Sequence, residues 1–315
     1  MIPKGMKCCL GRRMGLVRPD NSKLDSRFLY YYFFSPEWRR TVVENTISGA
    51  TVDRLPIKTF PSFPISLPPL SEQRRIVGIL SAYDDLIENN RKRIALLEES
   101  ARRLYKEWFL HLRFPGHERV PVEDGVPKGW KRTTVGEVCS SIRDAANPKR
   151  IEEGTPYIGL EHMPRRSITL SEWSTADDVT SGKLRFREGE ILFGKIRPYF
   201  HKVGITLVDG VASSDAIVIR PNAEELLPFV LLAVSSDAFV AATAQGMREG
   251  SKMPRADWKQ MQEFPLPRPP QSMLEAFNAL VTPVLRQCRV LALQSRTLAA
   301  ARDALLPRLM KGGVA

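Results

Sequence analysis

Clusters of lysine and arginine beside aromatic rings are the groups of this chain with the most evident chemistry. The segment GKIRPYFHK, residues 194–202, combines three basic side chains and two aromatic rings in a loop shaped by glycine and proline. The segment GMREGSKMPRADWK, residues 246–259, places further basic residues around two glycines. Arginine can form bidentate hydrogen bonds with guanine, and lysine more often contacts phosphates. We therefore predict a DNA-binding face made of Lys149, Arg150, Arg165, Arg166, Lys195, Arg197, Tyr199, Lys202, Arg248, Lys252 and Arg255.

The net charge of the chain agrees with a polyanionic partner. The 47 Lys and Arg against 35 Asp and Glu give a formal charge of +12 over 315 residues. Such an excess favours double-stranded DNA, because each neutralised phosphate releases counterions. Taken one at a time, each basic residue is better explained as a solvated surface charge. Four basic loops in one part of the chain favour a DNA-binding surface.

Motifs of catalysis are absent from the sequence. It contains no GxGxxG or GxxxxGK[ST] phosphate-binding loop and no Asn-Pro-Pro-Tyr-type adenine-methylation motif. The four histidines, His111, His117, His162 and His201, lack metal-ligand spacing, so we expect them at the surface or near DNA. The paired acids are typical of solvated charges on helices or turns: Asp84–Asp85, Glu98–Glu99 and Asp177–Asp178. We predict no catalytic residue, no metal and no cofactor.

The four cysteines and the apolar segments indicate a cytoplasmic protein. Cys8, Cys9, Cys139 and Cys288 form no CxxC pair, and we expect reduced, part-buried thiols. The N-terminal residues show no apolar signal region. No run reaches the roughly 18 apolar residues of a membrane span. A membrane is therefore not expected as a partner.

The first and last thirds of the chain repeat one another at a constant offset of 201 in residue number. Residues 28–31 align with 229–232, 63–64 with 264–265, and 68–69 with 269–270. With a slip of one position, 16–19 resemble 218–221. An ordered series of this kind indicates a duplicated unit.

The second copy of the unit begins near Trp130 and is expected to contain strands. Apolar runs at 191–193 and 216–219 predict strands, and residues 226–240 predict one amphipathic helix. A proline-rich exit and a long helix complete the copy. Projected back by the same offset, the position of Trp130 falls well before Met1, so we expect the first copy to be incomplete in this chain.

A heptad pattern predicts two long helices. After a proline-rich stretch, Ser71 is expected as the N-cap, and Asn90 is a polar member of an otherwise apolar seam. Pro283 should kink the second helix near its start or confine it to a first turn. The predicted coiled-coil and partner-docking residues are Ile76, Leu80, Ile87, Ile94, Leu97, Leu104, Leu291, Leu298 and Leu305.

These elements predict an α+β fold with two mixed α/β domains, the first partial, and two long helices that pair as an antiparallel coiled coil. Such pairing would place the two domains at opposite ends of a rod. A generic coiled-coil stalk, or separate helices that each pack on their own domain, remain alternatives. The predicted segments are 1–70, the partial first domain; 71–113, the central helix; 114–128, a linker; 129–270, the second domain; and 271–312, the C-terminal helix.

The proline-rich segment and the junction after the first helix resemble those of a known family. FPISLPPLSEQ at 63–73, WF at 108–109, RFPGHE at 113–118 and PKGW at 127–130 look like the specificity subunit of type I restriction–modification systems. That resemblance implies two target-recognition domains, each reading one half of a bipartite DNA site. It also implies partners: adenine methyltransferase (M) subunits that dock on the coiled coil, and a motor-nuclease (R) subunit.

The resemblance leaves alternatives open. The chain could be a structural coiled-coil adaptor with non-specific DNA binding, or an inactive remnant of a specificity subunit. A nuclease–methyltransferase fragment would need a catalytic motif that the sequence does not contain.

Overall fold

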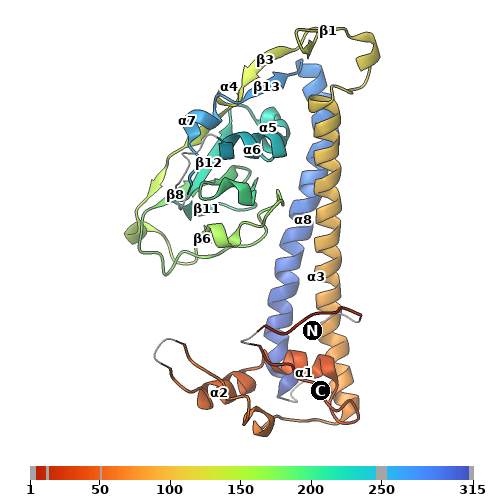
Figure 1. Cartoon of the computed structure of the whole chain (residues 1–315), viewed down its shortest axis with the longest axis vertical. Helices are drawn as coiled ribbons and strands as arrows, with labels where there is room; N and C mark the ends of the chain where they lie inside the picture. Colours follow the sequence, from red (N-terminus) through yellow and green to blue (C-terminus); the bar gives the residue numbers. More distant parts are fainter. Residues whose placement is uncertain (1–4, 12–13, 50–51, 246–253, 312–315) are drawn as a thin grey trace. The chain divides into compact units, whose positions relative to one another are not determined.

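The structure, a computed structural model, describes residues 5–11, 14–49, 52–245 and 254–311. The chain divides into two compact units: unit 1 comprises residues 1–89 and 295–315, and unit 2 comprises residues 90–294. Two long helices are present, α3 (Leu70–Tyr105) and α8 (Gln271–Met310) (Figure 1). One part of each helix belongs to unit 1 and the other part to unit 2. The fold is the predicted mixture of α-helix and β-sheet.

Unit 1 is helical in its described residues. α1 (Ser26–Tyr32) begins where the Asp25 carboxylate accepts hydrogen bonds from the backbone N–H groups of the first turn, and α2 (Pro36–Glu44) is capped by the Ser35 hydroxyl. A 3₁₀ turn, η1 (Phe60–Ser62), precedes the prolines. The core joins aromatic side chains of α1 and α2 to the long helices. Its buried residues are Phe28, Tyr31, Tyr32, Trp38, Phe63, Ile76, Leu80, Leu306, Leu309 and Met310.

Gln73 ties the start of α3 to α1. The helix begins at Leu70, so Ser71 lies inside its first turn and the predicted N-cap is wrong. The buried Gln73 amide donates to the carbonyls of Lys23 (3.0 Å) and Pro68 (2.8 Å), and its oxygen accepts from the Asp25 N–H (2.8 Å). One glutamine thus bonds three backbone groups and connects the segment before α1 to the segment before α3.

Unit 2 contains two larger sheets. The four-stranded sheet is antiparallel in the order β10-β9-β12-β4, with β10 at Val203–Ile205, β9 at Ile191–Gly194, β12 at Ala216–Pro221 and β4 at Cys139–Ile142. The five-stranded sheet has the order β5-β8-β11-β6-β7 and one parallel pair, β11 with β6. Its strands are β5 Ala145–Ala146, β8 Lys183–Phe186, β11 Gly210–Ser213, β6 Pro156–Ile158 and β7 Ser174–Thr175. The predicted strands at 191–193 and 216–219 are β9 and β12.

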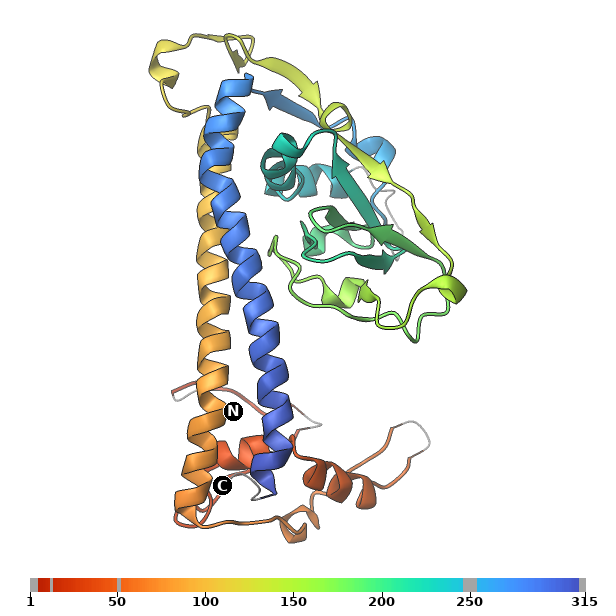
Figure 2. The same ribbon diagram turned by 180° about the vertical axis from the view of Figure 1, so that it is seen from behind.

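Two short ladders complete unit 2. β13 (Pro265–Arg268), the exit segment, pairs antiparallel with β3 (Lys131–Thr134), which lies at the entry to the domain (Figure 2). β1 (Val122–Glu123) pairs with β2 (Val126–Pro127). One-turn helices, α4 (Val135–Val138) and α7 (Trp258–Met261), follow β3 and precede β13. The chain therefore enters and leaves the domain through neighbouring strands.

The helix predicted over 226–240 is two helices. α5 (Leu227–Val234) and α6 (Asp237–Gln245) follow a 3₁₀ turn, η7 (Glu224–Leu226), and the Ser236 hydroxyl caps α6 by accepting from the Phe239 N–H. Every residue of α5 after Leu227 is buried, because α5 packs inside the main core of the unit. No single helix among the described residues is long and apolar enough to cross a membrane; the pair 224–234 and 237–245, bent by 64°, passes that test by length and composition alone.

The long helices pair antiparallel within each unit. In unit 1, Ile76 and Leu80 share a buried cluster with Leu306 and Leu309. In unit 2, Ile94 packs with Cys288 and Leu291, and the side-chain amide of Asn90 donates to Gln294 Oε1 at 3.2 Å. Pro283 lies in the interior of α8, so the helix is not confined to a first turn before it.

The repeat is visible in the elements themselves. α1 and α2 start at Ser26 and Pro36, and their counterparts α5 and α6 start at Leu227 and Asp237. α3 and α8 start at Leu70 and Gln271. All three pairs of starts keep the offset of the sequence alignment. Isolated bridges involve Arg54 in one copy and Arg255 in the other.

Candidate nucleic-acid interface

Three loops of unit 2 meet beside the end of β9. The backbone of residues 195–197 forms hydrogen bonds with residues 254–256. The Arg197 N–H donates to the Pro254 carbonyl at 2.9 Å, and the Ala256 N–H donates to the Lys195 carbonyl at 2.8 Å. The Lys195 N–H also donates to the Asp215 carbonyl, in the turn between β11 and β12. Residues distant in sequence, such as Arg197 and Arg255, are thereby brought together.

Phe200 lies at the centre of the strongest candidate surface. The Arg165 guanidinium carbon lies 4.0 Å from the centroid of the Phe200 ring and that of Arg197 lies 5.9 Å from it. Tyr199, which is 54% exposed, packs edge-on against Phe200 with centroids 5.0 Å apart. Cation–π contacts of this kind contribute about 0.5–1 kcal/mol at exposed sites and hold the guanidinium planes in place. We call Arg165, Arg197, Tyr199 and Phe200 the aromatic–arginine surface.

The backbone around this surface is shaped by an unusual turn. Residues 198–200 form a 3₁₀ turn, η6 (Pro198–Phe200), and both of its flanking residues adopt the left-handed conformation, Arg197 with φ 51° and His201 with φ 54°. Left-handed backbone is costly for residues with a side chain and is concentrated at functional sites. The hydrogen bond from the Arg197 N–H to Pro254 helps to hold this conformation.

Two predicted DNA-binding lysines are engaged within the protein. The Lys195 ammonium donates to the Ser214 carbonyl at 2.8 Å, and the Lys202 ammonium donates to the Leu160 carbonyl. Burial lowers the pKa of both groups from the ordinary value, and the positive charge of Arg165 adds to the lowering at Lys202. These lysines support the loops around the aromatic–arginine surface rather than extending freely from it.

Arg166 and His201 lie on the side of the loop that faces α6. Arg166 Nη1 is 2.9 Å from Asp237 Oδ1, at the start of α6. His201 is buried: its Nε2 bonds to the Ser235 carbonyl at 2.7 Å, and burial lowers its pKa. The expectation of a surface or DNA-side position for His201 is therefore wrong.

Of the remaining predicted residues, Arg255 lies beside residues 195–197, whereas Lys149 and Arg150 lie elsewhere in unit 2. Lys149 and Arg150 are exposed on a 3₁₀ turn, η4 (Pro148–Arg150), between β5 and β6. Arg255 is exposed and forms an ion pair with Asp215 at 3.3 Å. Arg248 and Lys252 lie outside the described residues. The predicted set missed Phe200, although it stands in the basic loop, and Arg143, whose charge helps to lower the pKa of Lys195.

The predicted seam residues lie in the helix pair. Ile76, Leu80, Ile87, Ile94 and Leu291 are buried, and Leu97, Leu104, Leu298 and Leu305 are partly buried. Other apolar residues of the long helices face outward: Leu86, Leu96, Leu280 and Val290 are all about half exposed or more, Leu96 at 71%. Side chains that pack between helices are not available to a partner, whereas the outward-facing ones are.

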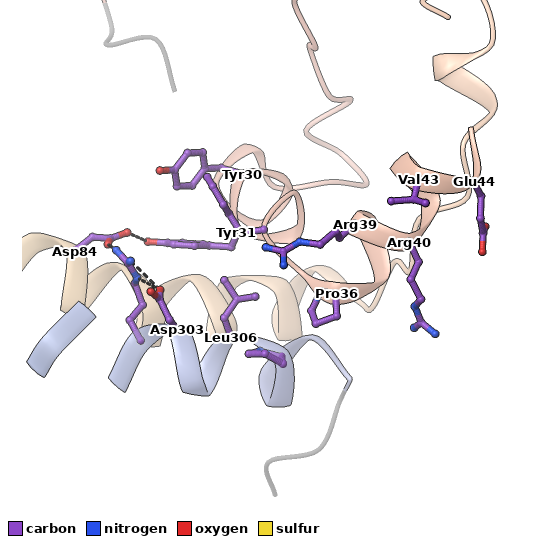
Figure 3. A pocket seen from close by; sticks show the side chains of 13 residues that line it. Tyr30, Tyr31, Pro36, Arg39, Arg40, Val43, Glu44, Asp84, Asp303 and Leu306 are labelled. Atoms are coloured by element: carbon purple, nitrogen blue, oxygen red, sulfur yellow. Dashed lines mark hydrogen bonds and ion pairs between the residues drawn. The ribbon is translucent and has the colours of Figure 1, made fainter. Parts of the chain in front are cut away.

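A cavity of unit 1 has a volume of about 940 Å³ and opens beside α1, α2 and the long helices (Figure 3). The Tyr31 hydroxyl donates to Asp84 Oδ2 at 2.6 Å, and the Arg302 guanidinium bonds both Asp84 and Asp303. Burial and the Asp84 carboxylate raise the pKa of Tyr31. Asp84 is thus a structural hydrogen-bond partner, and its expected role as a solvated charge is wrong.

The possible metal ligands and the cysteines form no further candidate site among the described residues. Among the described residues, no three His, Cys, Asp or Glu side chains are placed to hold one metal ion. Cys139 and Cys288 are buried, and burial raises the pKa of each thiol to about 12. Cys8 and Cys9 are exposed rather than part-buried as expected.

The sequence of this chain is similar to those of one protein family. The model of the type I restriction modification DNA specificity domain matches residues 1–99. The specificity subunit of the type I restriction enzyme MjaIX from Methanocaldococcus jannaschii is 25% identical over 299 residues, which cover 90% of this chain and 68% of that protein. The EcoDI specificity subunit from Escherichia coli is 23% identical over 249 residues, 70% of this chain and 55% of that protein.

A solved structure shares the fold. The crystal structure of the type I restriction–modification system S subunit from M. genitalium matches 92% of this chain and 74% of its own length, with a TM-score of 0.51 and 18% sequence identity. The chain spans roughly half to two thirds of the length of the curated relatives named above.

Proposed function

This chain belongs to the family of type I restriction–modification specificity subunits, and from that premise we propose that it selects the DNA target of such a complex without catalysing any step itself. Double-stranded DNA is the proposed ligand of unit 2. Methylation of adenine and DNA cleavage would be performed by M and R subunits in the cytoplasm.

The observation that carries this proposal is the aromatic–arginine surface. Arg165 and Arg197 come from separate loops and share one aromatic ring. Guanidinium groups held against an aromatic ring suit bidentate hydrogen bonds to base edges, and an exposed aromatic ring such as Tyr199 can stack on or wedge between bases. Lys149, Arg150 and Arg255 would supply phosphate contacts.

The coiled coil is the proposed docking site for M subunits. Because the seam side chains pack between the helices, we propose that the seam residues act by building the helix pair and that the outward-facing Leu86, Leu96, Leu280 and Val290 contact the partner. Residues 129–270 would form one complete recognition domain and residues 1–70 part of another, each directed at half of a bipartite site.

The experiment that tests this function is the selection of DNA from a random duplex library. The full chain, co-expressed with the adenine methyltransferase encoded beside it, is used to enrich bound sequences. A specificity subunit enriches a defined sequence and forms a stable complex with the methyltransferase. If the enriched pool remains random, the chain is not a specificity subunit.

The alternative is a coiled-coil adaptor with non-specific DNA binding, which the charge of +12 alone would support. An adaptor would bind all duplexes with the same steep salt dependence. A specificity subunit would retain a preference for the selected duplex at a salt concentration that removes binding to a scrambled one.

A further inference from the structure

Glu98 on α3 is a buried carboxylate that the sequence did not single out. Together with Glu99 it was expected to be a solvated helix charge, but only 2% of Glu98 is exposed. Its neighbour Glu99 does face solvent and pairs with Arg103 at 2.6 Å. A buried carboxylate is costly unless hydrogen bonds compensate for the lost water.

The bonds to Glu98 come from one segment of the recognition domain. Its Oε1 atom accepts hydrogen bonds from the Ser167 hydroxyl (2.8 Å), the Ile168 N–H (3.1 Å) and the Thr169 N–H (2.9 Å). Its Oε2 atom bonds Arg102, one turn further along the helix, at 3.2 Å. Charge-assisted bonds of this kind are the stronger ones, and here three of them converge on one oxygen.

Arg102 holds the same segment from the other side. Its Nη2 atom donates to the Arg166 carbonyl at 2.6 Å. An acid and a base one turn apart on the same helix therefore bind donors and an acceptor in residues 166–169. This segment, which we call the anchor segment, is fixed to the helix through both partners.

The anchor segment leads directly to the aromatic–arginine surface. Arg165, which stacks on Phe200, immediately precedes it. The Arg166 N–H donates to the His201 carbonyl at 2.9 Å, and the Ile205 N–H donates to the Ile168 carbonyl at 2.8 Å. The residues that follow the Phe200 turn, His201 and Ile205, are thus connected to the segment that Glu98 holds.

This arrangement belongs to one copy of the repeat. The positions equivalent to Glu98 and Arg102 in the second long helix are Ala299 and Asp303, which cannot reproduce the acid–base pair. Of the two long helices, α3 therefore has the acid–base pair at these positions and α8 does not.

We propose that Glu98 is a positioning residue for DNA recognition, holding Arg165 and the Phe200 turn in the geometry that reads bases. The inference rests on the proposed function. Base contacts require side chains placed to within a fraction of an ångström, whereas phosphate contacts depend mainly on charge. Loss of the Glu98 bonds should therefore reduce discrimination between sequences more than it reduces total DNA affinity.

The test compares Glu98→Gln with Glu99→Gln in the full chain. Both changes remove one negative charge from adjacent positions, so their effects on non-specific attraction to DNA are matched. The dissociation constants for the duplex enriched by the wild-type chain and for a scrambled duplex are measured on the same preparation. Their ratio does not depend on the folded fraction, which a purely structural role would change.

We expect Glu98→Gln to lower this ratio roughly tenfold, the size of one displaced base contact, with the scrambled duplex bound as well as before or slightly better. Glu99→Gln should leave the ratio unchanged. Ser167→Ala, which removes only one of the three donors, should lower the ratio by a smaller factor of about two to three and provides a second measurement if Glu98→Gln does not fold.

An unchanged ratio in Glu98→Gln, or in Ser167→Ala if that variant has to be used, would overturn the inference. A wild-type chain that binds the two duplexes equally would overturn the proposed function as well, and this is seen before any variant is measured.

Discussion

The helix pairs α1–α2 and α5–α6 are two copies of one sequence element that differ in what covers them. Tyr30 of α1 is 38% exposed, whereas Leu231, at the equivalent position of α5, is completely buried. In unit 2 the four-stranded sheet and its loops share a core with α5 and α6. The described residues of unit 1 contain no strand ladder, only the single bridge between Ile47 and Arg54.

The exit segments differ in the same way. Residues 265–268 form β13 and pair with β3, whereas the equivalent residues 64–67 form no strand. Residues 16–19 resemble 218–221 of the inner strand β12 but form no strand. Helix pairs and contacts with the long helices thus form in both copies. The difference teaches that the local sequence is sufficient to form the two helices of each pair. Burial of the face of these helices that points away from the long helices requires a sheet.

The largest expected effect comes from placing a charge at equivalent positions of the two copies. Leu231→Asp should destabilise unit 2 by ~4 kcal/mol or more, because a carboxylate would enter a fully buried site without a partner. Tyr30→Asp should cost about 1 kcal/mol, because that side chain already contacts solvent. Urea denaturation followed by tryptophan fluorescence and circular dichroism measures both. Equal losses would contradict the difference in cover.

A second comparison exchanges Gln73 and its counterpart Leu274. Gln73→Leu should cost about 1–3 kcal/mol, because the Asp25 N–H and two carbonyls lose their partner. Leu274→Gln should cost a similar amount by placing an amide in an apolar core. The free energies of unfolding of both variants test this. A neutral result for either exchange would show that the two helix starts are equivalent.

Arginines of the two copies should differ in their effect on DNA. Arg197→Ala should weaken binding to the selected duplex roughly tenfold, as expected for loss of one base contact. Arg40→Ala, at an exposed position of α2, should change it less than about twofold. Fluorescence anisotropy with the labelled duplex provides both values. A loss at Arg40 as large as that at Arg197 would show that Arg40 also contacts the bases of the selected duplex.

The smallest expected effect concerns the thiols. At pH 8, a thiol reagent should modify Cys8 and Cys9 rapidly and leave Cys139 and Cys288 unmodified, because burial raises the pKa of the latter pair to about 12. The ordinary pKa of a cysteine thiol is 9.0, so each buried thiol favours folding below that pH and its contribution falls as the pH rises from about 9 toward 12. Mass spectrometry of the labelled protein identifies the modified residues.

Pattern-based predictions succeeded where the pattern is local. The apolar runs at 191–193 and 216–219 are β9 and β12, and the sequence repeat reappears in the starts of α3 and α8. The single helix predicted over 226–240 failed because the serines at 235 and 236 end one helix and cap the next. Apolar periodicity does not register such a break inside a mostly apolar segment.

The candidate surface was only partly predictable. Basic and aromatic residues of the loop 194–202 stand out in the sequence, because their composition is unusual. Which of them point outward depends on partners far along the chain: the Ser214 carbonyl accepts from Lys195, the Leu160 carbonyl accepts from Lys202, and the Ser235 carbonyl bonds the buried His201. These pairings connect segments that are distant in sequence and have no signature in either segment alone.

The sequence by itself determined the duplication, the long helices, the proline-rich exits and the excess of basic charge. Each of these rests on short-range regularities such as heptad spacing, turn residues and composition. Only the tertiary structure decided that Glu98 is buried while Glu99 is exposed, and that Phe200 holds Arg165 and Arg197. The physical reason is that the burial of a polar group depends on whether a distant segment supplies hydrogen bonds, and the fold alone determines which segments meet.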